Sequence, residues 1–275
     1  RAAQAMGVKI RSEAEVAKIV TKNGAVSGVA LTSGDEFDAP RVASSVDCRL
    51  TFTKLLDPKT LPPDFVAAVD RIDYASASVK INVALSALPD FRACPGSTPG
   101  PQHRGTVHLC PDQDFIERAY DDAKYGGMSR EPIVECTIPS SVDPTVAPPG
   151  KHLMSMFCQY APYALEGGWN DARRNEFADN CFRLVERYAP GFTASVIDRQ
   201  ILSPVDLEST FNLTGGNIFQ GSMGLHQLFA FRPVPGFAGY RTPVKGLYVC
   251  GAAAHPGGGV MGAAGWNAAR EMLKR

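Results

Sequence analysis

The chain has 275 residues and carries 28 Lys and Arg against 28 Asp and Glu, so its formal net charge is zero. This balance gives no reason to expect nucleic acid or an acidic membrane surface as a partner. Hydrophobic residues make up 44% and charged residues 20% of the sequence, which indicates a globular rather than a disordered chain. No stretch approaches the roughly 18 consecutive apolar residues of a membrane helix, so we expect no integral membrane segment.

The seven cysteines are odd in number and nowhere form a C-x-x-C pair. This pattern disfavours a disulfide scaffold, a zinc site and a dithiol redox centre, and no histidine pair has metal-binding spacing. We therefore expect buried free thiols, no metal, and a reducing, cytoplasmic location.

Residues 1–6 resemble the last turns of a helix that Gly7 ends, and residues 8–10 are expected to begin a strand. Because a natural domain seldom begins inside a helix, we expect the chain to be the C-terminal part of a longer protein.

A β-meander is expected from the next segment, with a hairpin turn at Asn23-Gly24. Its four strands are expected at residues 16–21, 26–31, 36–39 and 41–46.

The middle of the chain alternates helical and strand patterns. Helices are expected after Pro63 and over 114–124 and 170–188, strands over 78–85, 133–138, 152–159 and 196–202, and loops over 89–105 and 203–240. No fixed-period repeat is present.

The last 30 residues are the most informative. A short apolar strand over 246–251 leads into a glycine-rich loop over 252–262 and a final helix over 263–275. Such a strand, loop and helix N-terminus point backbone N–H groups at an electron-rich ligand. Three adjacent glycines would let a flat ligand lie against bare backbone.

Gly257, Gly259 and Gly262 match the spacing of the dinucleotide-binding fingerprint. That interpretation requires a second strand and an acidic residue about 20 residues further on, whereas only 13 residues follow Gly262. The loop is therefore not the pyrophosphate turn of a complete Rossmann unit.

The stretch 247–265 resembles the C-terminal flavin motif of the phytoene desaturase group in the FAD-dependent amine oxidase-like superfamily. The chain is most similar to the branch named after pyridine nucleotide-disulphide oxidoreductase domain-containing protein 2. Supporting resemblances lie at 138–144, 160–163, 214–219 and Arg232-Pro233. Two departures are Ala252, where many members have an acidic residue, and the lack of the family's N-terminal GxGxxG.

This resemblance implies FAD as cofactor of the full-length protein, with binding by the present chain in doubt. It implies that the glycine loop lies under the flavin, that the N-terminus of the last helix meets the ring edge, and that the main chain of Val16 meets the adenine. The implied cofactor residues are Val16, Gly251, Ala252, His255, Pro256, Gly257, Gly258, Gly259, Val260, Met261 and Gly262. Tyr160, Phe219 and His226 are the candidate substrate residues, and no catalytic side chain is assigned.

We therefore predict an α/β fold, α+β in detail, with an incomplete Rossmann-like FAD domain and a mixed-sheet substrate domain. Residues 1–50 and 236–275 are expected in the FAD domain and residues 51–235 in the substrate domain. The predicted function is hydride transfer from an apolar or amine-like small molecule to flavin, with the present chain inactive alone. The alternative is a non-catalytic substrate-binding or protein-interaction module. We also expect a homodimer through surface exposed by truncation.

Overall fold

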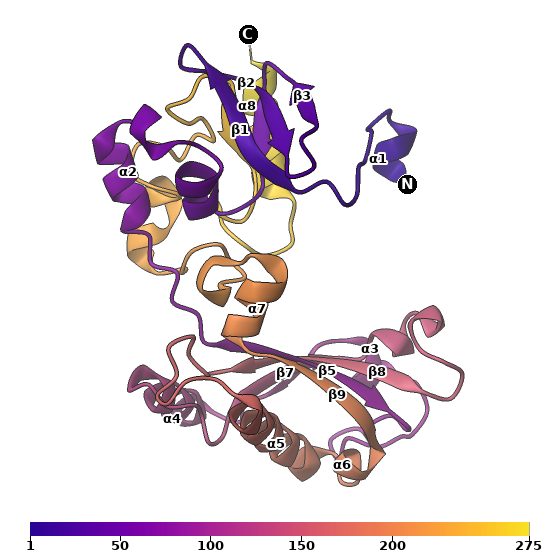
Figure 1. Cartoon of the computed structure of the whole chain (residues 1–275). Helices are drawn as coiled ribbons and strands as arrows, with labels where there is room; N and C mark the ends of the chain where they lie inside the picture. Colours follow the sequence, from indigo (N-terminus) through magenta and orange to yellow (C-terminus); the bar gives the residue numbers. More distant parts are fainter. Residues whose placement is uncertain (275) are drawn as a thin grey trace. The chain divides into compact units, whose positions relative to one another are not determined.

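A computed structural model describes residues 1–274, which fold as two compact units (Figure 1). Unit 1 contains residues 1–74 and 218–274, and unit 2 contains Ala75–Asn217. The expected divisions after residues 50 and 235 differ from these. The first boundary lies later because helix α2 (Pro63–Asp70) buries Phe65 and Val69 in the same apolar core as Ile19 and Val249. The second lies earlier because residues 220 and 232 are hydrogen-bonded to the glycine-rich loop of unit 1. The roles assigned to the two parts remain predictions.

Unit 1 contains two sheets and seven helical segments among the described residues. Besides α2, its elements are α1 (Ala2–Ala5), β1 (Val16–Lys22), β2 (Ala25–Leu31), β3 (Glu36–Asp38), β4 (Val42–Ser44), β10 (Leu247–Val249), α8 (Ala263–Leu273), and the short helical turns Leu50–Lys54, Pro58–Thr60, Leu225–Gln227 and Phe229–Phe231.

The first three strands of unit 1 form the predicted meander, in the order β1-β2-β3. Asn23 and Gly24 both have positive φ, at 52° and 74°, which is the backbone that a tight two-residue hairpin requires. The fourth predicted strand, β4, does not join the meander. It pairs in parallel with β10, some 200 residues away in the sequence, and such a pairing is invisible to a local pattern.

The strand expected at residues 8–10 is wrong. Val8 and Ile10 are 51% and 61% exposed, and no strand is present before Val16 in the described chain. Their alternation matched a strand, but no partner strand or core buries their apolar side chains.

Unit 2 is built on a five-stranded antiparallel sheet in the order β6-β7-β8-β5-β9. Its elements are β5 (Ser78–Leu85), α3 (Pro101–Arg104), β6 (Val107–Leu109), α4 (Gln113–Lys124), β7 (Ile133–Thr137), β8 (His152–Gln159), α5 (Asp171–Tyr188), α6 (Phe192–Ser195), β9 (Val196–Leu202), α7 (Pro204–Phe211), and the short turns Pro139–Ser141, Pro144–Val146 and Thr214–Gly216.

One face of this sheet is covered by α4, α5 and α6 (Figure 1). Alternation along β5 places Val79, Ile81, Val83 and Leu85 in the core between sheet and helices. Strands β5, β7, β8 and β9 and the long helices α4 and α5 agree with the sequence prediction within one or two residues, whereas the short strand β6 was not predicted. Helix α7, in contrast, lies in a predicted loop.

Helix α7 begins with a capping box that the loop prediction missed. The Ser203 N–H donates to the Asp206 carboxylate at 2.9 Å. This reciprocal arrangement of Ser and an acid three residues later satisfies two helix N-terminal donors. The Gly and Pro content of the following residues hid this short element.

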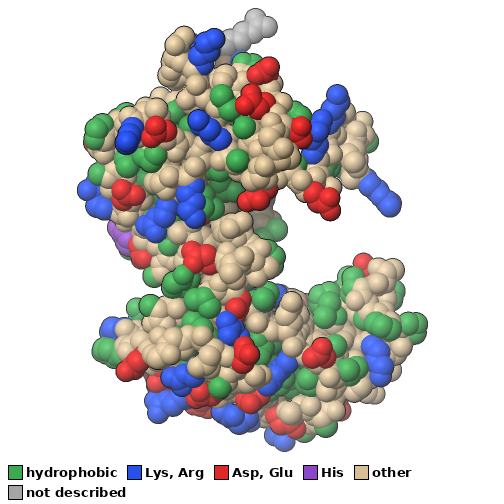
Figure 2. All heavy atoms as spheres, viewed as in Figure 1, with side chains coloured by type: hydrophobic (Ala, Val, Ile, Leu, Met, Phe, Trp, Pro, Cys, Tyr) green, Lys and Arg blue, Asp and Glu red, His purple; other side chains and the backbone are tan. Residues whose placement is uncertain are grey.

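The two ends of unit 2 are held side by side. The Asn217 Nδ2 donates to the Ala75 carbonyl at 2.9 Å, and the Ser76 Oγ donates to the Gly216 carbonyl at 3.1 Å. Figure 2 shows cationic and anionic side chains interspersed over the visible face of each unit, as the balanced composition predicts. Across residues 1–274, no helix combines the length and apolar character that crossing a bilayer requires.

Candidate functional site

The predicted strand, glycine loop and helix are all present in unit 1. Strand β10 is fully buried, and the Cys250 N–H continues its pairing with β4 by donating to the Ser44 carbonyl at 2.9 Å. After the loop, Gly262 adopts φ +70° and begins α8. The first N–H groups of a helix have no intrahelical acceptors, so they carry partial positive charge toward the loop.

The glycines in the inner half of the loop, residues 251–258, are required by the chain's own packing. A Cβ at Gly251 would lie 2.2 Å from the Ser45 carbonyl oxygen, and one at Gly258 would lie 2.3 Å from Cδ1 of Phe219. At Gly257 it would lie 3.0 Å from Sδ of Met223. Two of the three adjacent glycines therefore have an explanation that needs no bound ligand.

A buried arginine fastens this inner half. Arg232 is only 2% exposed, and its Nε and Nη2 donate to the Ala252 carbonyl at 3.0 and 2.8 Å. The same guanidinium donates to the carbonyl of Phe219. Burial lowers the pKa of Arg232, because removing water disfavours the charged guanidinium. The hydrogen bonds to the carbonyls offset part of this unfavourable desolvation.

Gln220 makes a second bridge to the loop. Its Oε1 accepts from the Ala253 N–H at 3.0 Å, while its Nε2 donates to the Ser45 carbonyl at 2.9 Å. Segment 219–232 thus holds the loop at Ala252 and Ala253, two positions in succession.

His255 has a polar atom that the described chain leaves unsatisfied. Its carbonyl accepts from the Tyr240 hydroxyl at 3.0 Å, and Asn267 of α8 donates to that hydroxyl at 2.8 Å. The Nδ1 of its half-buried ring, however, is buried and finds no hydrogen-bond partner within residues 1–274. Such a group costs about 1–3 kcal/mol, and a bound polar group at this position would remove that cost.

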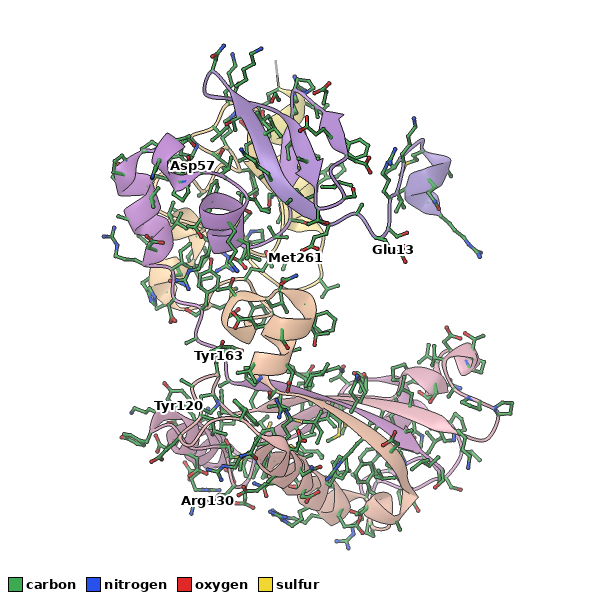
Figure 3. The ribbon with its side chains drawn as sticks, viewed as in Figure 1. Glu13, Asp57, Tyr120, Arg130, Tyr163 and Met261 are labelled. Atoms are coloured by element: carbon green, nitrogen blue, oxygen red, sulfur yellow. The ribbon has the colours of Figure 1, made fainter. Side chains whose placement is uncertain are left out.

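The outer half of the loop, residues 259–262, is open. Val260 is 109% exposed with φ +47°, a left-handed conformation that a β-branched residue rarely adopts. Met261 (Figure 3) is 58% exposed, and Trp266 in the first turn of α8 is 68% exposed. Exposed apolar side chains, an unsatisfied ring nitrogen and a helix N-terminus together fit a flat ring with polar edges, such as that of a flavin.

The implied cofactor residues from Gly251 to Gly262 therefore lie in one continuous loop. Val16 lies elsewhere in unit 1, at the first residue of β1. Their contacts with a cofactor remain predictions.

The three candidate substrate residues lie in different places. Phe219 packs on Gly258, and His226 lies in the short turn Leu225–Gln227 of unit 1 with its ring over Gly224. Tyr160 follows β8 in unit 2, where its ring meets that of Tyr120 edge-to-face, with 5.5 Å between the ring centroids.

Arg232 and Gln220 were not predicted as site residues. Arg232 is the single charged residue in the otherwise apolar run 228–237, and this isolation is the signal that could have marked it. Its five carbonyl acceptors, in contrast, come from loops whose course no local pattern predicts.

The thiols near the site are poor nucleophiles at neutral pH. Burial, together with the nearby Asp47, raises the pKa of Cys48 to about 12, and burial also raises the pKa of Cys250. All seven cysteines are free.

The chain belongs to the flavin-containing amine oxidoreductase family, whose model matches residues 1–273. This finding confirms the predicted membership in a family of flavin-containing oxidoreductases.

Two curated relatives show which members of this family the chain resembles. The chain is 48% identical over 275 residues to pyridine nucleotide-disulfide oxidoreductase domain-containing protein 2 of Mus musculus, with 98% of this chain and 47% of that protein covered. It is 28% identical to a lycopene-forming phytoene desaturase of Pseudescherichia vulneris, covering 94% of this chain and 49% of the desaturase. The chain thus spans about half the length of the curated relatives it matches.

A solved structure confirms the fold class. An oxidoreductase from Methanosarcina mazei aligns with a TM-score of 0.61 at 22% identity, over 98% of this chain and 51% of that one. At 22% identity, this similarity supports the mixed helix-and-sheet fold and nothing further.

Proposed function

We propose that this chain supplies the flavin-contacting loop of an FAD-dependent oxidoreductase that removes a hydride from a small organic substrate. The observation that carries the proposal is the unsatisfied Nδ1 of His255, buried beside the open outer half of the glycine loop. Membership in the flavin-containing amine oxidoreductase family supports a flavin as the cofactor, and the unsatisfied Nδ1 offers it a hydrogen bond. The desaturase names among the relatives favour dehydrogenation as the reaction type.

Bound FAD would supply the hydride acceptor, and the residues of this chain would hold it. Gly259, Val260 and Met261 would lie against the ring, and His255 Nδ1 would share a proton with a polar atom of the cofactor. The N-terminus of α8 would stabilise negative charge at the ring edge, because its N–H groups carry partial positive charge. Arg232 would act as a positioning residue by holding the loop.

The proposal also keeps the sequence-derived substrate residues. Phe219, His226 and Tyr160 each stay a candidate contact of the substrate, which the sequence predicts to be apolar or amine-like. Because the curated relatives are about twice as long, we expect the chain alone to bind FAD weakly and to be inactive.

Titration of the chain with FAD, followed by flavin fluorescence, tests this proposal. We expect a saturable change that His255→Ala weakens about tenfold, the cost of one hydrogen bond to a buried group. His108→Ala is the control, since His108 is an exposed histidine on β6 of unit 2. The proposal fails if no saturable change occurs, a result that would favour the non-catalytic module, or if both variants bind like the wild type.

We further propose that the chain self-associates through unit 1. Among the described strands, β4 pairs with β10 alone and so has an open edge. The exposed Val260, Met261 and Trp266 add apolar surface. Light scattering should give a mass near twice 29.4 kDa, and Val260→Asp should lower it, whereas a monomeric wild type would contradict the proposal.

A cytoplasmic location is also proposed. It rests on the seven free cysteines, which suit a reducing compartment. Fractionation of cells that produce the full-length protein would test it.

A further inference from the structure

The sheet of unit 2 has a second face, opposite the helices, that carries a row of reactive and aromatic side chains. We call it the outer face. Directly paired residues of neighbouring strands share a face, so the register identifies its members. Lys80 on β5 pairs with Phe157 on β8 and with Leu202 on β9, and Phe157 in turn pairs with Glu135 on β7.

Lys80 stands near the middle of this face in a partly apolar setting. Its side chain is half-buried between two apolar neighbours, and its Nζ donates to Oγ of Ser155. Burial lowers the pKa of Lys80, because water is partly withdrawn from the ammonium group. A bound anion would therefore stabilise the charged form of Lys80.

A second row, beside Lys80, consists of hydrogen-bonding side chains. Register places Thr137, Ser155, Asn82 and Gln200 side by side on β7, β8, β5 and β9. The Asn82 Nδ2 donates to Gln200 Oε1 at 3.0 Å. Because these amide and hydroxyl groups line up across four strands, they offer both donors and acceptors to one elongated polar ligand.

These two rows discriminate among substrate classes. A pure hydrocarbon would remove water from the ammonium of Lys80 and from the amides without replacing their hydrogen bonds. A protonated amine would meet the like charge of Lys80. The carboxylate of Glu135 does not relieve this repulsion, because Phe157 lies between it and Lys80 in the sheet.

We propose that the outer face binds a small organic acid, with its carboxylate paired to Lys80 and its polar groups bonded to Asn82 and Ser155. That this ligand is the substrate rests on the proposed function above. The proposal replaces an amine-like substrate with one that carries an acidic group on an apolar body, for which Phe157 and Leu202 provide the contact.

Three probes of one shape and different charge test this assignment. Benzoate, benzamide and benzylamine share an aromatic ring and are anionic, neutral and cationic at neutral pH. Calorimetric titration of the chain should show benzoate binding at least about tenfold more tightly than benzylamine, with benzamide between them. The proposal is overturned if benzoate binds no more tightly than benzylamine, including the case in which neither binds at millimolar concentration.

Variants assign the selectivity to one side chain. Lys80→Met should abolish the preference for benzoate while Lys80→Arg keeps it, and Lys151→Met, at an exposed lysine just before β8, should leave it unchanged. A Lys80→Met chain that still prefers benzoate would overturn the proposal; circular dichroism would confirm that it is folded. None of these titrations contains FAD, so failure of the flavin proposal and failure of this one give separate results.

Discussion

Replacing Arg232 with methionine should loosen the glycine loop. The substitution removes the Arg232 N–H donors from the carbonyls of Ala252 and Gln227. Each buried carbonyl left unpaired costs about 1–3 kcal/mol. Because methionine also removes the cost of burying a charge, the lower half of the summed range applies, about 3 kcal/mol.

Hydrogen–deuterium exchange of peptides spanning residues 250–262 measures this effect directly. At about 1.4 kcal/mol per factor of ten, the loop should open on the order of 100-fold more often than in the wild type. Arg232→Lys should lie between the two, since lysine keeps the charge but has fewer donors.

Arg241→Met is the matched control. Arg241 is also in unit 1, but its side chain is 56% exposed and pairs with Glu271 at 2.6 Å on the surface. Such pairs contribute at most about 1 kcal/mol. If Arg232→Met exchanges no faster than Arg241→Met, the fastening role of Arg232 is refuted.

Two further predictions concern packing and pH. Gly258→Ala should lower the melting temperature, at a cost of about 1–3 kcal/mol in stability, because its Cβ would lie 2.3 Å from Phe219. Gly239→Ala is the control and should leave the melting temperature unchanged, because a Cβ there meets nothing within 4 Å. Equal melting temperatures of the two variants would refute the packing argument. Burial alone would raise the pKa of Asp206, but hydrogen bonds, chiefly from Arg174, lower it. The ionised Asp206 therefore stabilises the folded state above its unfolded pKa of about 3.9, and this stabilisation is lost as the pH falls through the lower folded pKa. In thermal melts, Asp206→Asn should lower the melting temperature at pH 7 and progressively less below about pH 4. A difference that does not depend on pH would contradict this.

The sequence predicted elements well wherever a local pattern was strong. The glycine loop between β10 and α8 was found from its residues alone, and α5 from its helical spacing, because each signal lies within a few turns of chain. Helix α7 was missed because the Gly and Pro residues that follow it favoured a loop over the whole of 203–240.

The supports of the site could not be predicted in the same way. Arg232 and Gln220 reach the loop from 20 and 33 residues away, through carbonyls and amides that every residue possesses. A glycine likewise does not reveal whether a ligand or a side chain approaches it. Only the folded chain shows that Phe219 and Met223 occupy two of the three positions.

The hydrogen bonds that join Ala75 to Asn217 and Ser76 to Gly216 make unit 2 an insertion with adjacent ends. A segment that leaves and re-enters at one place can be excised without stretching the remainder. Residues 75–217 should therefore fold when produced alone. A short turn in their place should allow the two segments of unit 1 to fold together. Exchange of this segment between relatives would move the whole five-stranded sheet, with Lys80 and its neighbours on the outer face, as one piece.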